Sequence, residues 1–266
     1  MIIVSDTSPL INLAAFPDHF SKQSRDYARY RPLYPATLYE YLASLTRGHD
    51  RAWDCGTGNG QAAIGLARHF QAVVATDPSE KQIAQAPAHD RIAYHVATAE
   101  DSGIDDRSID LITVALAVHW FDLDRFYAEA QRVLRSPDAV SGKPGGILAV
   151  WCYNLTEITP EIDRVMESYY HDVLGEFWPP QIRWVDEHYR TLPFPFDEIA
   201  APEFAVEAAW SLRDLFGYLS SWSAAQKFAE ARGFDPLNEV RATWATAWGS
   251  MQVRTVRWPL YLRVGR

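Results

Sequence analysis

The residues best suited to chemistry form a glycine-rich turn that follows a short apolar run. Residues 54–60 read Asp-Cys-Gly-Thr-Gly-Asn-Gly. Three closely spaced glycines permit a sharp turn and let a ligand approach the backbone. The G-x-G-x-G spacing departs from the dinucleotide fingerprint G-x-G-x-x-G, and the Gly-Lys-Ser/Thr of a phosphate loop is absent. The acid before the glycines, Asp54, would repel a pyrophosphate and suits a ligand that carries an amine.

Polar residues also follow the next three apolar runs. Asp77 ends the second run, Glu100 follows the third, and His119 with Trp120 follows the fourth. Ligands of open parallel sheets bind outside the carboxyl ends of the strands, where an acid after the second strand reaches ribose hydroxyls. We therefore expect these residues to meet at one sheet edge, with Glu100 near an adenine.

The elements that must position these residues alternate between strand and helix. Short β-like runs are predicted at residues 52–53, 71–76, 92–96, 109–118 and 147–151. Helices are predicted at residues 35–45, 61–70, 80–86 and 123–134. This alternation favours an α/β fold with a parallel sheet and helices on both faces.

The second half of the chain has a different texture. Eight of the ten tryptophans follow residue 150, in a stretch where helical patterns dominate. The last residues, 253–264, alternate like a strand, and residues 136–143 form a turn-rich stretch that predicts an exposed loop. Large rings line apolar pockets that orient small substrates, so an aromatic substrate region is expected there.

Composition limits the class of protein. The 266 residues include 25 Lys plus Arg and 34 Asp plus Glu, a net charge of −9. Such a charge disfavours nucleic acid and anionic membranes as partners, and no apolar run approaches the roughly 18 residues of a membrane span. Two cysteines exclude a disulfide scaffold and favour a reduced, cytoplasmic setting. The eight histidines are scattered without metal-binding spacing, so no metal is expected.

The ordered set of motifs resembles the class I S-adenosylmethionine-dependent methyltransferases. The glycine turn, Asp77 and the Ala99-Glu100 pair are similar to that family's cofactor motifs. Arg135 followed after eight extra residues by Pro-Gly-Gly resembles its turn before the fifth strand. Within the family, the chain is most similar to the trans-aconitate methyltransferase-like group (methyltransferase type 11-like). That likeness is carried by residues 27–35, 117–122, 222–226 and 256–262.

The resemblance implies a seven-stranded Rossmann-like sheet with an aromatic-rich helical lid inserted before the last strands. It also implies S-adenosylmethionine as the cofactor and S-adenosylhomocysteine as the product. The residues expected to contact the cofactor are Tyr27, Arg31, Asp54, Gly56, Thr57, Gly58, Gly60, Asp77, Pro78, Ser79, Ala99, Glu100, Ala115 and His119.

Several of these roles have structural alternatives. Asp54 binds the methionine amine directly or through water, or only orders the loop. Asp77 either binds the ribose hydroxyls or caps the N-terminus of a helix, a role that Ser79 could also fill. Glu100 is either an adenine contact or an exposed loop acid, with Ala99 or Asp101 making the contact.

His119 is the one candidate catalytic residue. It lines the substrate site, acts as a general base, or is only a hydrogen-bonded structural group. The residues expected to line the acceptor pocket are Trp120, Trp151, Tyr153, Trp178 and Trp222.

We divide the chain into four parts. An N-terminal extension (1–19) precedes a cofactor-binding core (20–153), a helical lid and substrate region (154–245), and terminal strands that return to the core sheet (246–266). Residues 1–15 resemble the opening of a PIN-domain nuclease, but the rest of that fold has no room in the chain. A gene-fusion remnant or a misassigned start explains this stretch.

The predicted activity is methyl transfer from S-adenosylmethionine to a small molecule, with carboxyl O-methylation favoured by the resemblance. One alternative acceptor is a phenol, amine or natural-product hydroxyl. An alternative function is a module that binds the cofactor but catalyses no reaction. A nucleic-acid methyltransferase is disfavoured by the net negative charge of the chain. The sequence leaves the oligomeric state open.

Overall fold

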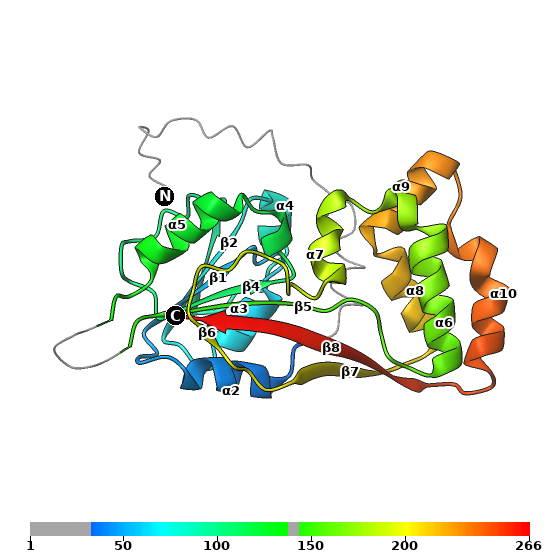
Figure 1. Ribbon diagram of the computed structural model, residues 1–266, viewed down its shortest axis with the longest axis horizontal. Coiled ribbons are helices and arrows are strands. Elements are labelled where there is room, and N and C mark those ends of the chain that lie inside the picture. Colours follow the sequence, from blue (N-terminus) through cyan, green and yellow to red (C-terminus); the bar gives the residue numbers. More distant parts are fainter. Residues whose placement is uncertain (1–32, 138–143) are drawn as a thin grey trace.

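The computed structural model describes residues 33–137 and 144–266 (Figure 1). The predicted extension at 1–19, the PIN-like stretch, Tyr27 and Arg31 lie outside the described residues. So do residues 138–143 of the predicted exposed loop.

A single mixed sheet organises the described part of the chain. Its order is β3-β2-β1-β4-β5-β8-β6, and β7 pairs with β8 off this path. The strands are β1 Arg51–Cys55, β2 Ala72–Asp77, β3 Ile92–Val96, β4 Leu111–Ala115, β5 Ile147–Cys152, β6 Glu198–Ile199, β7 Phe204–Trp210 and β8 Arg254–Gly265. Strands β1 to β5 run parallel, and β8 is antiparallel to β5. The predicted Rossmann-like α/β class is confirmed.

Alternate residues of the central strands feed two cores, one on each face of the sheet. In β1, Ala52 packs into one core and Trp53 into the other, and both are fully buried. Every residue of β5 is buried. Continuous apolar runs are what strands covered on both faces require, which explains why these segments lack a polar side.

Helices cover both faces, as Figure 1 shows for α5 above the sheet and α2 below it. Helices α2 Ala36–Ser44 and α3 Gln61–Leu66 pack into the first core, and α5 Leu123–Val133 packs into the second. The helix predicted at 80–86 is shorter, α4 Glu80–Ile83. The fourth strand was predicted too long: it ends at Ala115 because Leu116 turns with φ of 54°.

The inserted region after β5 is mostly helical, and its longer helices lie together at one end of the molecule (Figure 1). Its longer helices are α6 Pro160–Ser168, α8 Leu212–Ser220, α9 Ser223–Arg232 and α10 Leu237–Trp248. Its shorter turns are η3 Tyr169–Val173, η4 Gly175–Phe177, η5 Pro180–Ile182 and α7 Arg183–Asp186. None of the helices within the described ranges could cross a membrane.

Strands β6 and β7 also belong to this part of the chain, where the sequence predicted that helical patterns dominate. The terminal segment correspondingly supplies one long strand, β8, where terminal strands in the plural were expected. The first half of β8 pairs with β7 and its second half pairs with β5. A single strand therefore joins the inserted region to the cofactor-binding sheet.

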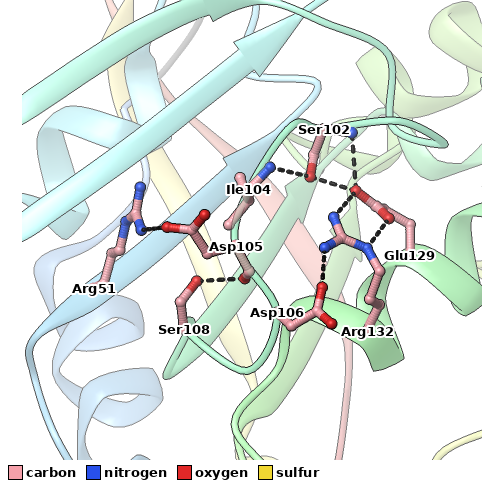
Figure 2. A network of polar contacts seen from close by, with 8 residues as sticks. All are labelled: Arg51, Ser102, Ile104, Asp105, Asp106, Ser108, Glu129 and Arg132. Carbon is pink, nitrogen blue, oxygen red and sulfur yellow. Dashed lines mark hydrogen bonds and ion pairs between the residues drawn. The ribbon is translucent and has the colours of Figure 1, made fainter.

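A polar network fixes the loop between β3 and β4 on helix α5 (Figure 2). The buried carboxylate of Glu129 accepts hydrogen bonds from the backbone N–H and hydroxyl of Ser102, at 2.9 and 2.5 Å. The guanidinium of Arg132 donates to the same carboxylate at 2.7 and 2.8 Å and also contacts Asp106. Burial alone would raise the pKa of Glu129, but the hydrogen bonds from Arg132 and Ser102 lower it by more. The net pKa therefore lies below its usual value, and the carboxylate stays ionised.

Removing this acceptor should destabilise the fold. Glu129→Ala leaves the buried Ser102 donors without their acceptor and removes two hydrogen bonds of the Arg132 guanidinium, which should cost about 2–3 kcal/mol of unfolding free energy. The matched control is Asp106→Ala, because Asp106 contacts the same guanidinium but its side chain is 73% exposed. That variant should lose less than about 1 kcal/mol. Urea unfolding measures both, and equal losses would contradict the role of the buried carboxylate.

Candidate active site

The glycine loop lies between β1 and α3, at the carboxyl edge of the sheet. Gly56, Gly58 and Gly60 have φ of 68°, 55° and 85°, in the left-handed region that glycine tolerates. A Cβ at Gly56 would lie 2.7 Å from the Cβ of Ala117, and one at Gly60 would lie 2.4 Å from the Tyr94 hydroxyl. At Gly58 a Cβ would meet nothing within 4 Å. The loop is therefore packed at both ends and open at its centre, where a ligand can approach the backbone.

Asp77 lies at the end of β2 and faces this loop. One carboxylate oxygen accepts the N–H of Gly58 at 2.9 Å, and the other accepts the N–H of Ser79 at 2.9 Å. Ser79, after Pro78, caps α4 by accepting the N–H of Gln82. Asp77 is only half-buried, and an ionised carboxylate accepts several hydrogen bonds at once, so its side chain suits ligand hydroxyls.

Asp54 is enclosed by protein. Its side chain is fully buried, and its two oxygens accept the hydroxyls of Thr57 at 2.5 Å and Thr113 at 2.9 Å. Burial raises the pKa of Asp54 to about 6, against the lowering effect of these hydrogen bonds. This geometry favours the loop-ordering role among the alternatives, since the bonds tie the glycine loop to β4.

The segment after β3 joins the segment after β4. The carboxylate of Glu100 accepts the backbone N–H of Asp122 at 2.9 Å, and the neighbouring Ala99 is buried in the second core. Ala115 ends β4, directly before this crossing. The sheet thus brings the predicted adenine segment beside the residues that follow the fourth strand.

His119 lies in the 3₁₀ turn η2 Val118–Trp120 and is only 4% exposed. Its Nδ1 is 2.8 Å from the hydroxyl of Tyr189, and burial lowers the pKa of His119 to about 3. The ring of Trp120 lies beside it, with centroids 5.0 Å apart. The imidazole is therefore neutral near pH 7, held by a phenol of the inserted region.

The four other predicted pocket aromatics form two groups in the first core. Trp151 and Tyr153, at the end of β5, both approach the ring of Tyr34, with centroids 5.3 and 6.4 Å away. Trp178 and Trp222 lie 5.6 Å apart in the inserted region. The fold brings these pairs into one continuous apolar core.

Two residues near the site, Tyr189 and Tyr94, were not predicted from the sequence. Tyr189 sits in a short turn without a motif, and only the fold brings it to His119. Tyr94, in β3, directs its hydroxyl at Gly60, and this buried oxygen has no partner among the described residues. A tyrosine in a predicted strand gave no reason to expect the approach of Tyr94 to Gly60. No cluster of His, Cys, Asp and Glu that could hold a metal occurs in the ranges described.

Comparisons with known proteins now identify the family. Residues 53–150 match the family described as methyltransferase domain. The chain is 34% identical to a Dictyostelium discoideum protein named as a methyltransferase, over 96% of this chain and 97% of that one. The chain belongs to the S-adenosylmethionine-dependent methyltransferases.

Two further methyltransferases support this assignment. A structure described as a type II methyltransferase from Anaeromyxobacter dehalogenans is 43% identical, with a TM-score of 0.80, over 89% of this chain and 97% of that one. A Saccharomyces cerevisiae protein named as an S-adenosylmethionine-dependent methyltransferase is 28% identical over 58% of this chain and 55% of that one. The chain is therefore an enzyme, and the alternative of a non-catalytic binding module is not supported.

The site has the chemistry that this methyltransferase cofactor requires. A ribose offers vicinal hydroxyls, and Asp77 provides a half-buried carboxylate at the strand end. The cofactor also needs close approach to a backbone turn, and the open centre of the glycine loop at Gly58 provides it. S-adenosylmethionine thus fits the residues present.

Asp54→Asn separates the cost of the buried charge from the loop's hydrogen bonds. The pKa of Asp54 rises from 3.8 to about 6 on folding, so the native state binds more protons than the unfolded state between these values. Wild-type stability therefore falls as pH rises through this window. The neutral Asn variant escapes that loss, and its stability relative to wild type should improve by roughly 3 kcal/mol between about pH 3.5 and about pH 7. Urea unfolding at both pH values tests this, and a pH-independent difference would contradict it.

Proposed function

We propose that this methyltransferase transfers the methyl group of S-adenosylmethionine to a carboxylate of a small molecule. The observation that carries this choice is the burial of His119, which is 4% exposed with its Nδ1 2.8 Å from the Tyr189 hydroxyl; this burial lowers the pKa of His119 to about 3. Such a weak base would take a proton poorly from a phenol, whose ordinary pKa is about 10. A carboxylate is already ionised near pH 7 and needs no base.

The cofactor contacts follow from the positions of the strand ends. Asp77 accepts ribose hydroxyls, while the backbone at Gly58 lies against the cofactor. Ala99 and Glu100 border the adenine. Gly56, Thr57, Gly60, Pro78 and Ser79 shape the surrounding loops, and Ala115 and His119 lie toward the methionyl end. Contacts from Tyr27 and Arg31 stay a prediction.

The bound cofactor supplies a methyl group on a sulfonium sulfur. The protein's own work is positioning and exclusion of water, which carry much of the barrier reduction in such a displacement. The aromatic residues Trp120, Trp151, Tyr153, Trp178 and Trp222 form the acceptor side. Aromatic faces also stabilise a nearby cation by about 0.5–2 kcal/mol, which suits a site that must hold a sulfonium.

The finer assignments remain part of this proposal. Membership of the trans-aconitate methyltransferase-like group stays a prediction from the sequence motifs. A net charge of −9 supports a small-molecule partner over nucleic acid. Cys55 and Cys152 are free and buried, which is consistent with a reduced, cytoplasmic location.

Asp77→Asn tests the cofactor site. Loss of the charge-assisted bonds to the ribose should weaken S-adenosylhomocysteine binding at least about tenfold, since such bonds contribute roughly 1.5–3 kcal/mol each. The control is Glu80→Gln, which removes the same charge three residues away on the exposed start of α4. Calorimetric titration should show near wild-type affinity for this control. Undiminished binding by folded Asp77→Asn would exclude the ribose role.

The acceptor class is tested by the stability of the product. The enzyme is incubated with methyl-labelled S-adenosylmethionine and panels of small polycarboxylic acids, phenols and amines. Methyl esters release labelled methanol in mild base, whereas aryl ethers and methylamines do not. We expect base-labile label from the carboxylic acids alone, and a base-stable product would favour a phenol or amine acceptor.

A further inference from the structure

Tyr189 belongs to the inserted region and contacts His119 at the carboxyl edge of the sheet. It follows α7 and is fully buried in the second core, together with Val118 and Cys152. Its hydroxyl lies 2.8 Å from Nδ1 of His119. The contact joins residues 70 positions apart in the chain, so the inserted region packs against the Nδ1 side of His119.

The backbone that aims this phenol is strained. His188 and Tyr189 both have φ of 57°, a left-handed conformation that residues other than glycine adopt only at an energetic cost and as single residues. Strain of this kind persists only where the surroundings enforce it, and it gathers at functional sites. The turn is held from within, since the N–H of Tyr189 donates to the carbonyl of Trp184 at 2.7 Å.

Strand β8 holds the same turn from outside. The ring of His188 stacks on Tyr261, with centroids 3.5 Å apart and planes 7° apart. The guanidinium of Arg263 donates to the carbonyl of Tyr189 at 3.0 Å. Side chains on both sides of the turn therefore fix the direction of the Tyr189 phenol.

The protons of this pair follow from donor and acceptor strength. Burial raises the pKa of Tyr189 well above its usual value, so the phenol keeps its proton. Among the described residues, His119 is the one hydrogen-bond partner of this hydroxyl. If Nδ1–H donated instead, the buried phenol O–H would have no acceptor there, and an unmade buried donor is costly. The phenol therefore donates to Nδ1, which leaves the imidazole proton on Nε2.

The groups around the pair are consistent with a neutral imidazole. Those that influence Tyr189 are Cys152, Tyr34 and Tyr127. Burial raises the pKa of the Cys152 thiol, and burial raises that of Tyr127 to about 12 against the opposing effect of Arg263. The thiol and that phenol are thus uncharged near neutral pH, and for His119 itself burial is the one cause of its shift.

We propose that Tyr189 is a positioning residue that holds His119 as the Nε2–H tautomer, so that His119 donates a hydrogen bond to the methyl acceptor instead of removing a proton from it. This inference rests on the methyl transfer proposed above. One oxygen of the acceptor carboxylate forms the new O–C bond, while the C–S bond breaks and its electron pair stays on sulfur. His119 binds the other carboxylate oxygen, and no proton moves.

The tautomer is read directly by long-range ¹H–¹⁵N NMR of the full chain with labelled histidine. The His119 signal is assigned by its loss in His119→Gln. We expect an unprotonated Nδ1 and a protonated Nε2, unchanged between about pH 5.5 and about pH 8.5, because the pKa lies far below. A protonated Nδ1, or titration near pH 6.5, would overturn the proposal.

Tyr189→Phe tests the positioning residue, because it removes only the hydroxyl. We expect the two His119 nitrogen shifts to move toward each other as both tautomers become populated. With a working acceptor, kcat should fall severalfold while S-adenosylhomocysteine affinity stays near wild type. Unchanged nitrogen shifts in the variant would refute the role of Tyr189. The wild-type spectrum decides the tautomer even if this variant misfolds.

Side-chain replacement at position 119 separates a donor from a base. Glutamine places an amide N–H near the position of Nε2, whereas asparagine places it near Nδ1. We expect His119→Gln to keep kcat within about fivefold of wild type and His119→Asn to lose more than about tenfold. Equal loss in both variants would favour a base and overturn the donor role. If no carboxylic acid is methylated, the proposed acceptor class fails, while the NMR result still judges the tautomer.

Discussion

Two threonine hydroxyls donate to one fully buried carboxylate, that of Asp54, and the placement of the glycine loop depends on this arrangement. Thr57 belongs to the glycine loop and Thr113 to the neighbouring strand β4. Their bonds hold the loop at the sheet edge, where Asp77 then accepts the N–H of Gly58. The buried charge is costly, as the raised pKa of Asp54 shows, and its retention is explained by the loop geometry that it fixes.

Strand β8 connects the sheet to the inserted region, where the proposed acceptor side lies. Its second half completes the sheet beside β5, and its first half pairs with β7 of the inserted region. Tyr261 and Arg263 on the same strand hold the turn that presents Tyr189. Cofactor core and inserted region therefore share one continuous element, which explains how a residue of the insertion reaches His119 with a defined direction.

The sequence predicted the parallel part of the sheet well because that part depends on local patterns. Apolar runs predicted β1 to β5, and the glycine turn with Asp77 predicted the edge at which they meet. Other features depend on contacts distant in the chain. The end of β4 at Leu116 is set by a left-handed turn, and β7 exists because β8 pairs with it. The burial of Asp54 and the contact of Tyr189 with His119 likewise needed the fold.

The two sides of the site are consequently free to vary in different ways. The cofactor side is built from loops that follow successive parallel strands, so a change there disturbs the sheet itself. The proposed acceptor side draws on an insertion whose residues follow no fixed spacing, and function in shared folds is decided at such sites. Among the described residues, the phenol of Tyr189 gives this insertion a polar contact with His119, in the turn that follows β4. Under the role proposed for His119, acceptor chemistry is therefore best sought in the turn at residues 188–189, because that turn sets whether the imidazole donates a hydrogen bond to the acceptor or removes a proton from it.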